Sequence, residues 1–136
     1  MKITIETVIK SDIDTVWSVW NNPEDIKQWN AASDDWHTTS STIDLREGGK
    51  FSSRMEAKDG SAGFDFSGTY TKVKEKRLIE YKMEDGRFVE TQFVPTSDSI
   101  KIIETFDAET ENDPELQRQG WQSILDNFAM YVEAKG

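Results

Sequence analysis

Hydrophobic and polar residues alternate along the first ten positions of the chain. Ile3, Ile5 and Ile9 share one side of the segment 2–10, and lysine, threonine and glutamate side chains occupy the other side. A period of two is typical of a β-strand that buries one face. The first predicted element is therefore a half-buried strand.

The spacing of the apolar residues lengthens directly after this strand. Ser11-Asp12-Ile13-Asp14 carries a Ser-x-x-acid capping signal, and the apolar residues that follow recur at the spacing of a short amphipathic helix. Asn22-Pro23 then starts a second helix, because asparagine caps helices and proline fits the first helical position. The residues expected to face inward from these two helices are Ile13, Val16, Trp17, Trp20, Ile26 and Trp29.

The middle of the chain returns to strand-like alternation and is interrupted by glycine turns. Residues 30–37 are typical of a loop, and six strands are expected after it. Gly48-Gly49 ends the first of these strands, and Asp85-Gly86 joins two others through a strong short hairpin signal. The expected strands span residues 38–45, 50–58, 63–74, 77–84, 87–95 and 99–107.

The last predicted element is one long helix. Trp121, Leu125 and Phe128 recur at helical spacing downstream of an acidic loop. Gly120 lies inside this helix, where it either allows a strand or ligand to come close or is a tolerated surface glycine. The order of elements is strand, two helices, six strands and helix, in a single domain over residues 1–136.

Several local motifs accompany this order of elements. They are Val16-Trp17, Asn22-Pro23-Glu24 with Trp29, the segment 44–51 (DLREGGKF), Asp59-Gly60, Gly68-Thr69-Tyr70 and the segment 120–128 (GWQSILDNF). Together they resemble the START-like SRPBCC superfamily, and within it the branch homologous to the activator of heat-shock-protein-90 ATPase. The resemblance covers nearly the whole chain.

The resemblance implies an α+β helix-grip fold. In this fold a curved antiparallel sheet wraps around a long C-terminal helix, and two short helices follow strand 1. It further implies an apolar cavity between sheet and helix, no invariant catalytic residue and no cofactor. A chaperone is an implied partner, although the eukaryotic activator grips its chaperone with a separate N-terminal domain that these residues do not match.

Large apolar side chains gather on one face of the predicted sheet and on the long helix. Such a set forms either a close-packed core or the wall of a ligand cavity, to which Tyr70 and Tyr81 contribute hydroxyl groups. Trp29 and Trp36 are expected at the entrance. The candidate ligand-binding residues are Trp29, Trp36, Phe51, Met55, Phe64, Phe66, Tyr70, Tyr81, Phe93, Trp121, Leu125 and Phe128.

A polar group occupies the opposite strand face. Arg54, Glu56 and Asp65 share this face, and a four-residue loop at 59–62 would place Glu56 across from Asp65. The group is either a solvated surface ion pair or, if this face looks inward, a set of buried acids suited to acid–base chemistry. Alternation alone leaves both alternatives open.

His37 is the only histidine, and it follows Asp34-Asp35-Trp36. It is a candidate general base, but a Gly-x-Ser-x-Gly elbow is absent and there are too few His and Cys residues for a zinc site. The acidic run 107–113 lacks the spacing of a calcium loop. We therefore assign no catalytic and no metal-binding residue, and keep a cyclase- or hydrolase-type enzyme only as an alternative.

Charge and composition narrow the range of partners. The chain has 26 acidic and 16 basic residues, and a net charge of −10 disfavours nucleic acids and anionic headgroups. No apolar run approaches the ~20 residues of a membrane span, and we expect a cytoplasmic protein.

The leading hypothesis is a carrier or sensor of a small apolar molecule, lipid-like or aromatic. A chaperone-activator-like interaction domain and an enzyme are the alternatives.

Overall fold

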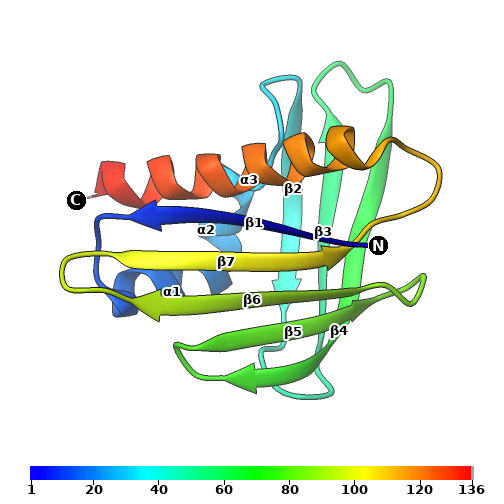
Figure 1. Cartoon of the computed structure of the whole chain (residues 1–136). Helices are drawn as coiled ribbons and strands as arrows, with labels where there is room; N and C mark the ends of the chain where they lie inside the picture. Colours follow the sequence, from blue (N-terminus) through cyan, green and yellow to red (C-terminus); the bar gives the residue numbers. More distant parts are fainter. Residues whose placement is uncertain (136) are drawn as a thin grey trace.

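Seven antiparallel strands form one strongly curved sheet in the computed structural model, which describes residues 1–135 (Figure 1). The strands pair in the order β1-β7-β6-β5-β4-β3-β2, so β1 and β2 are the two edges. They are β1 (Lys2–Ile9), β2 (Trp36–Ile43), β3 (Lys50–Ala57), β4 (Gly63–Lys74), β5 (Leu78–Met83), β6 (Phe88–Pro95) and β7 (Ile100–Asp107). Register shifts in β2 and in the long β4 mark irregular points of the curved sheet.

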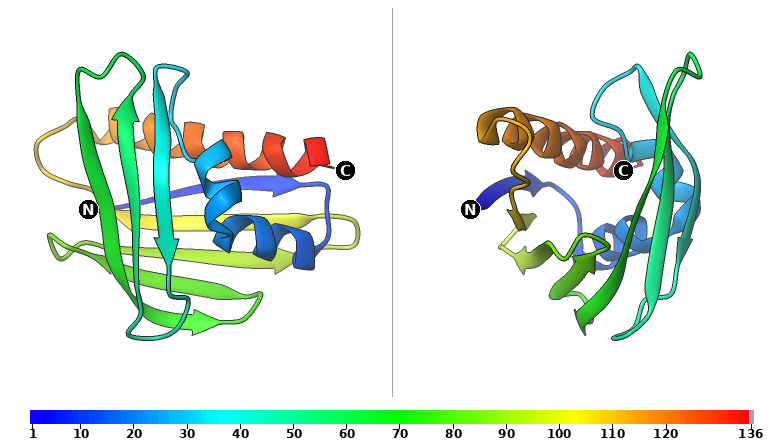
Figure 2. Two further views of the ribbon diagram at one scale, coloured as in Figure 1. Left: turned by 180° about the vertical axis from the view of Figure 1, so that it is seen from behind. Right: turned by 90° about the vertical axis from the view of Figure 1, so that its right-hand side faces the viewer.

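Three helices complete the described part of the chain: α1 (Ile13–Asn21), α2 (Pro23–Trp29) and α3 (Pro114–Lys135). Asp12 caps α1 by accepting a 2.8 Å hydrogen bond from the backbone N–H of Thr15. Asn22 caps α2 in the same way, with Pro23 at the start of the helix. The side view shows the sheet curling around the space under α3, with α1 and α2 at one end (Figure 2, right).

The long helix α3 covers the free edge of β1. Arg118 donates to the carbonyl oxygen of Thr4 at 2.8 Å, and Gln122 donates to that of Glu6 at 3.1 Å. These side chains satisfy edge carbonyls that would otherwise be open to pairing with another strand. The position of α3 is therefore fixed along one strand, and its inner side faces the concave surface of the sheet.

The helix-grip architecture expected from the sequence is confirmed. Trp36 and His37 belong to β2, which starts two residues earlier than predicted. The predicted pairing of Glu56 with Asp65 is wrong, because Asp65 lies opposite Arg54 and Glu56 lies opposite Gly63. The backbone N–H of Ala57 donates to the carbonyl oxygen of Ala62 at 2.9 Å, so the turn covers residues 58–61 and begins one residue earlier than expected, which moves the register.

The glycine in α3 has no close neighbour. A Cβ built on Gly120 would meet no heavy atom within 4 Å, so neither a strand nor a side chain depends on the missing methyl group. Of the two interpretations of this position, the structure favours the tolerated glycine. Gly86 differs, because its φ of 92° is needed for the turn between β5 and β6.

Candidate ligand-binding cavity

A cavity of about 400 Å³ lies between α3, the two short helices and the concave face of the sheet. Its polar wall residues are few and include Ser53, Arg87, Glu104, Glu109 and Gln117. The larger, apolar part of the wall is formed by Trp20, Ile26, Trp29, Ile43, Phe51, Met55, Phe64, Phe66, Tyr70, Ile79, Tyr81, Trp121, Ile124 and Leu125. The cavity thus has the composition that is common in small-molecule sites.

The aromatic wall is a set of rings in mutual contact. Phe51 packs edge-on against Tyr81, with ring centroids 4.7 Å apart. Phe66 meets the indole of Trp121 at 6.1 Å, which joins the sheet to α3. Trp121 is also stacked on Phe106 at 4.2 Å with only 9° between the ring planes. These contacts hold the rings in place, so the wall has a defined shape.

Most of the aromatic and apolar residues chosen from the sequence lie on this wall, but three do not. Phe128 is fully buried between Trp20 and Trp29, with ring centroids at 4.8 Å from each. Phe93 is buried against the edges of Trp17 and Trp20. Trp36 lies near Phe64, at a second and more polar depression. Phe93 and Phe128 therefore belong to the packed core beside the cavity.

One wall residue that sequence reasoning missed is Glu104. It is only 6% exposed, on the inner face of β7, and its Oε2 accepts a 2.9 Å hydrogen bond from the hydroxyl of Thr91 on β6. Burial raises the pKa of Glu104 to about 7, and the bond from Thr91 opposes that rise. A signal existed in the sequence: Ile100, Ile102 and Phe106 alternate inward, and Glu104 continues their spacing.

Some polar atoms of the wall residues have no protein partner among residues 1–135. Within residues 1–135 the structure gives no hydrogen bond to the hydroxyls of Tyr70 and Tyr81 or to Oε1 of Glu104. No fully buried side-chain oxygen or nitrogen of residues 1–135 lacks a partner, so these three atoms keep some accessible surface, and the three residues that carry them line the cavity. Burial raises the pKa of both phenols, and the charge of Glu104 raises that of Tyr81 further.

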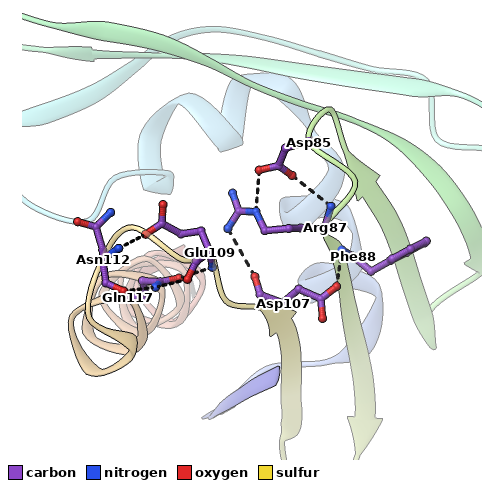
Figure 3. Close-up of polar contacts among 7 residues, drawn as sticks. All are labelled: Asp85, Arg87, Phe88, Asp107, Glu109, Asn112 and Gln117. Atoms are coloured by element: carbon purple, nitrogen blue, oxygen red, sulfur yellow. Dashed lines mark hydrogen bonds and ion pairs between the residues drawn. The ribbon is translucent and has the colours of Figure 1, made fainter. Parts of the chain in front are cut away.

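A polar rim, formed by Arg87, Glu109, Asn112 and Gln117, lies where the β5–β6 turn approaches the loop before α3 (Figure 3). The Nε of Arg87 donates to the carboxylate of Asp85 at 2.7 Å. The side-chain oxygen of Gln117 accepts a 2.9 Å bond from the backbone N–H of Glu109, which fixes the loop against the helix. The rim is therefore ordered by its own hydrogen bonds, and the charge of Arg87 is already paired.

The polar groups considered as catalytic candidates lie elsewhere. Arg54 bonds Glu56 at 3.1 Å and Asp65 at 3.5 Å on the outer, solvated face of the sheet, so the inward-facing alternative is wrong. Asp34 and His37 border the second depression, and Asp35 is exposed. Residues 1–135 contain no cluster of three side chains placed to hold a metal ion. None of the helices in this part of the chain is long and apolar enough to cross a membrane.

A curved seven-stranded sheet closed by one long helix over an apolar cavity defines a START-like helix-grip domain. The chain belongs to the family described as "Activator of Hsp90 ATPase homolog 1-like protein", whose model matches residues 10–133. A comparison with curated proteins gave no match.

Solved structures share this fold over nearly their whole length. The solution structure of the AHSA1-like protein from Aeromonas hydrophila is 54% identical, covers 100% of this chain and 94% of that chain, and has a TM-score of 0.94. A solution structure from Cytophaga hutchinsonii is 46% identical, with coverages of 98% and 93% and a TM-score of 0.86. A crystal structure from Nitrosomonas europaea, 17% identical over 99% and 96%, shows the fold alone at a TM-score of 0.84.

Proposed function

We propose that the protein binds a small, mostly apolar molecule in the cavity under α3, as a carrier or sensor. The supporting observation is the cavity itself, about 400 Å³ with a wall of aromatic and aliphatic side chains. Protein interiors are close-packed and rarely leave a void much larger than a water molecule. A space of this size with a few polar groups is typical of a ligand site.

The ligand is enclosed from two sides in this proposal. The sheet contributes Phe51, Phe66 and Tyr81, and α3 contributes Ile124 and Trp121. Apolar contact on both sides removes most of a small ligand's surface from water, at about 25 cal/mol per Å² buried. Affinity then depends on how well the ligand fills the space between helix and sheet.

Native mass spectrometry of protein purified gently from its own host gives a first test. A discrete adduct that is lost on denaturation supports the proposal and supplies the ligand's mass.

A matched pair of α3 variants tests whether the ligand binds in the cavity. Ile124→Trp fills the cavity, whereas Met130→Trp adds the same ring to a side chain that is 62% exposed on the same helix. The affinity for octanol, measured by calorimetry, should weaken at least tenfold in the first variant only.

A second role is favoured by the family match, since the family is named after an activator of a chaperone ATPase. In this role the domain interacts with an Hsp90-type chaperone and stimulates its turnover. The test is ATP hydrolysis by the host's chaperone with increasing amounts of this domain. Turnover that stays at its basal rate when the domain is saturating contradicts the role, and leaves the cavity proposal untouched.

A further inference from the structure

We propose that the cavity selects apolar ligands that carry an ammonium group, and that Glu104 is the residue that binds this group. The inference rests on the proposed function and specifies the ligand's polar end. It is carried by the position of one carboxyl group, which lies on the apolar cavity wall with one oxygen hydrogen-bonded to Thr91 and the second oxygen without a protein partner among residues 1–135.

The strands on either side leave Glu104 with few partners. In the register of the sheet, Glu104 lies opposite Thr91 of β6 on one side and opposite Ile5 of β1 on the other. A carboxylate offers about four acceptor positions, and Thr91 occupies one of them. Oε1 has no protein partner among residues 1–135, and a ligand group with several N–H donors in the cavity would satisfy it.

The described part of the protein supplies no counter-ion for Glu104. Arg87 is the only cationic residue on the cavity wall, and its Nε is held by the carboxylate of Asp85 at 2.7 Å (Figure 3). Its Nη1 donates to the backbone carbonyl of Asp107 at 3.5 Å. With Arg87 paired in this way, Glu104 and Glu109 leave the wall with a negative balance. A cationic ligand would neutralise this excess negative charge, whereas a carboxylate ligand would be repelled by it.

The aromatic wall suits the same kind of ligand. Phe51, Phe66 and Tyr81 contact one another with ring centroids 4.7 to 6.2 Å apart, and Trp121 closes the set from α3. Ring faces attract a cation held within about 6 Å of their centroids. The charge of Glu104 also contributes to the raised pKa of Tyr81, so the carboxylate and this ring act on the same space.

Three probes of equal chain length test the inference with the full chain: octylammonium, octanol and octanoate, measured by calorimetry at pH 8. Wild-type protein should bind octylammonium at least about tenfold more tightly than octanol, as expected for hydrogen bonds to a charged group, and octanoate least tightly. Glu104→Gln keeps the size of the side chain and an acceptor for Thr91, and should remove the preference. Glu75→Gln removes a charge from an exposed side chain that is not on the cavity wall, and should change the preference less than about threefold.

The pH dependence of wild-type binding is a second, independent measurement. The ionisable residues on the cavity wall are Tyr70, Tyr81, Arg87, Glu104 and Glu109, and the three helices place only apolar and uncharged side chains on it. The residue of β1 beside Glu104 is Ile5, which is also uncharged. Octylammonium keeps its charge below about pH 10, as a lysine side chain does. Its affinity should therefore rise by up to about tenfold per pH unit below pH 7 and level off above it, where Glu104 is ionised.

The possible outcomes separate the two proposals. Equal binding of octanol and octylammonium, or a preference that survives in Glu104→Gln, overturns the inference and leaves the proposed function intact. Binding of none of the three probes overturns both. If Glu104→Gln loses its fold, the pH series decides, because a flat profile for octylammonium between pH 5.5 and 8.5 overturns the inference with wild-type protein alone.

Discussion

The hydroxyl of Thr91 on β6 donates a 2.9 Å hydrogen bond to Oε2 of Glu104 on β7, and the two residues are direct partners in the register of these strands. Both positions are buried among apolar neighbours. The threonine thus provides the one protein bond of a carboxyl group that would otherwise meet only hydrocarbon and the cavity.

Glu104 should make the protein less stable as pH rises from 5 to 8. Its pKa is about 7 in the folded protein against an ordinary value of 4.5, so the folded state holds the proton more tightly than the unfolded state. The contribution of the carboxyl group is therefore most favourable below pH 4.5, is lost as pH rises towards 7, and is constant above that. The two pKa values differ by an amount that corresponds to about 3 kcal/mol.

Urea unfolding at pH 5 and pH 8 measures this effect. Wild-type protein should lose roughly 2–3 kcal/mol more than Glu104→Gln between the two pH values, because glutamine has no proton to release. Subtracting the variant's change in the free energy of unfolding from that of the wild type removes the contribution of the many surface carboxylates. Parallel pH profiles for the two proteins would show that Glu104 titrates normally.

Thr91→Val should destabilise the protein more at pH 8 than at pH 5. The valine keeps the shape of the side chain but removes the donor, and a hydrogen bond to a charged group contributes about 1.5–3 kcal/mol. At pH 5 the carboxyl group is protonated, and we expect a loss of about 1 kcal/mol. Thr91→Ser, which retains a hydroxyl, serves as the control in the same urea titrations. Equal losses at the two pH values contradict the assignment.

Gly120→Ala should stabilise the protein by about 1 kcal/mol. The position is inside α3, where glycine costs that amount relative to alanine, and a Cβ there meets no atom within 4 Å. Urea denaturation gives the change in the free energy of unfolding. The same substitution at Gly86, whose φ is 92°, should instead destabilise the protein, and this contrast controls for a general effect of alanine.

Tyr131→Phe should loosen the contact between α2 and α3. The hydroxyl of Tyr131 donates a 2.6 Å hydrogen bond to the carboxylate of Asp25, which also pairs with Lys135 at 3.4 Å. Loss of the hydroxyl should lower the free energy of unfolding by about 1 kcal/mol. Amide hydrogen exchange should show faster opening at the C-terminal end of α3 than at Trp121. Unchanged exchange rates in the last turns of α3 contradict a fastening role.

The order of elements was predictable because each carried a local signal. Alternation marked the strands, Asn22-Pro23 marked the start of α2, and Asp85-Gly86 marked a turn. The register of β3 and β4 was not predictable from such signals. It depends on where the turn begins, and Asp59-Gly60 fits a turn that begins at residue 58 as well as one that begins at residue 59.

The cavity wall was predictable in part. Alternation identifies which side chains share a face, and it placed Phe51, Phe66 and Tyr81 together. It does not distinguish a residue beside empty space from one beside another ring, which is why Phe128 was grouped with the wall although Trp20 and Trp29 enclose it. The spacing of Ile100, Ile102 and Phe106 places Glu104 on the inner face, but the cavity beside it depends on the neighbouring strands and α3, which the sequence does not position.

Three of the five tryptophans, Trp20, Trp29 and Trp121, lie on the cavity wall. The indole of Trp121 is held between Phe106 and Phe66, so its ring changes surroundings only when the space in front of it fills or empties. If an apolar ligand binds there, as proposed, it should shift the emission of this indole towards the blue. The fluorescence of the protein itself would then report occupancy, and compound collections could be screened without a label.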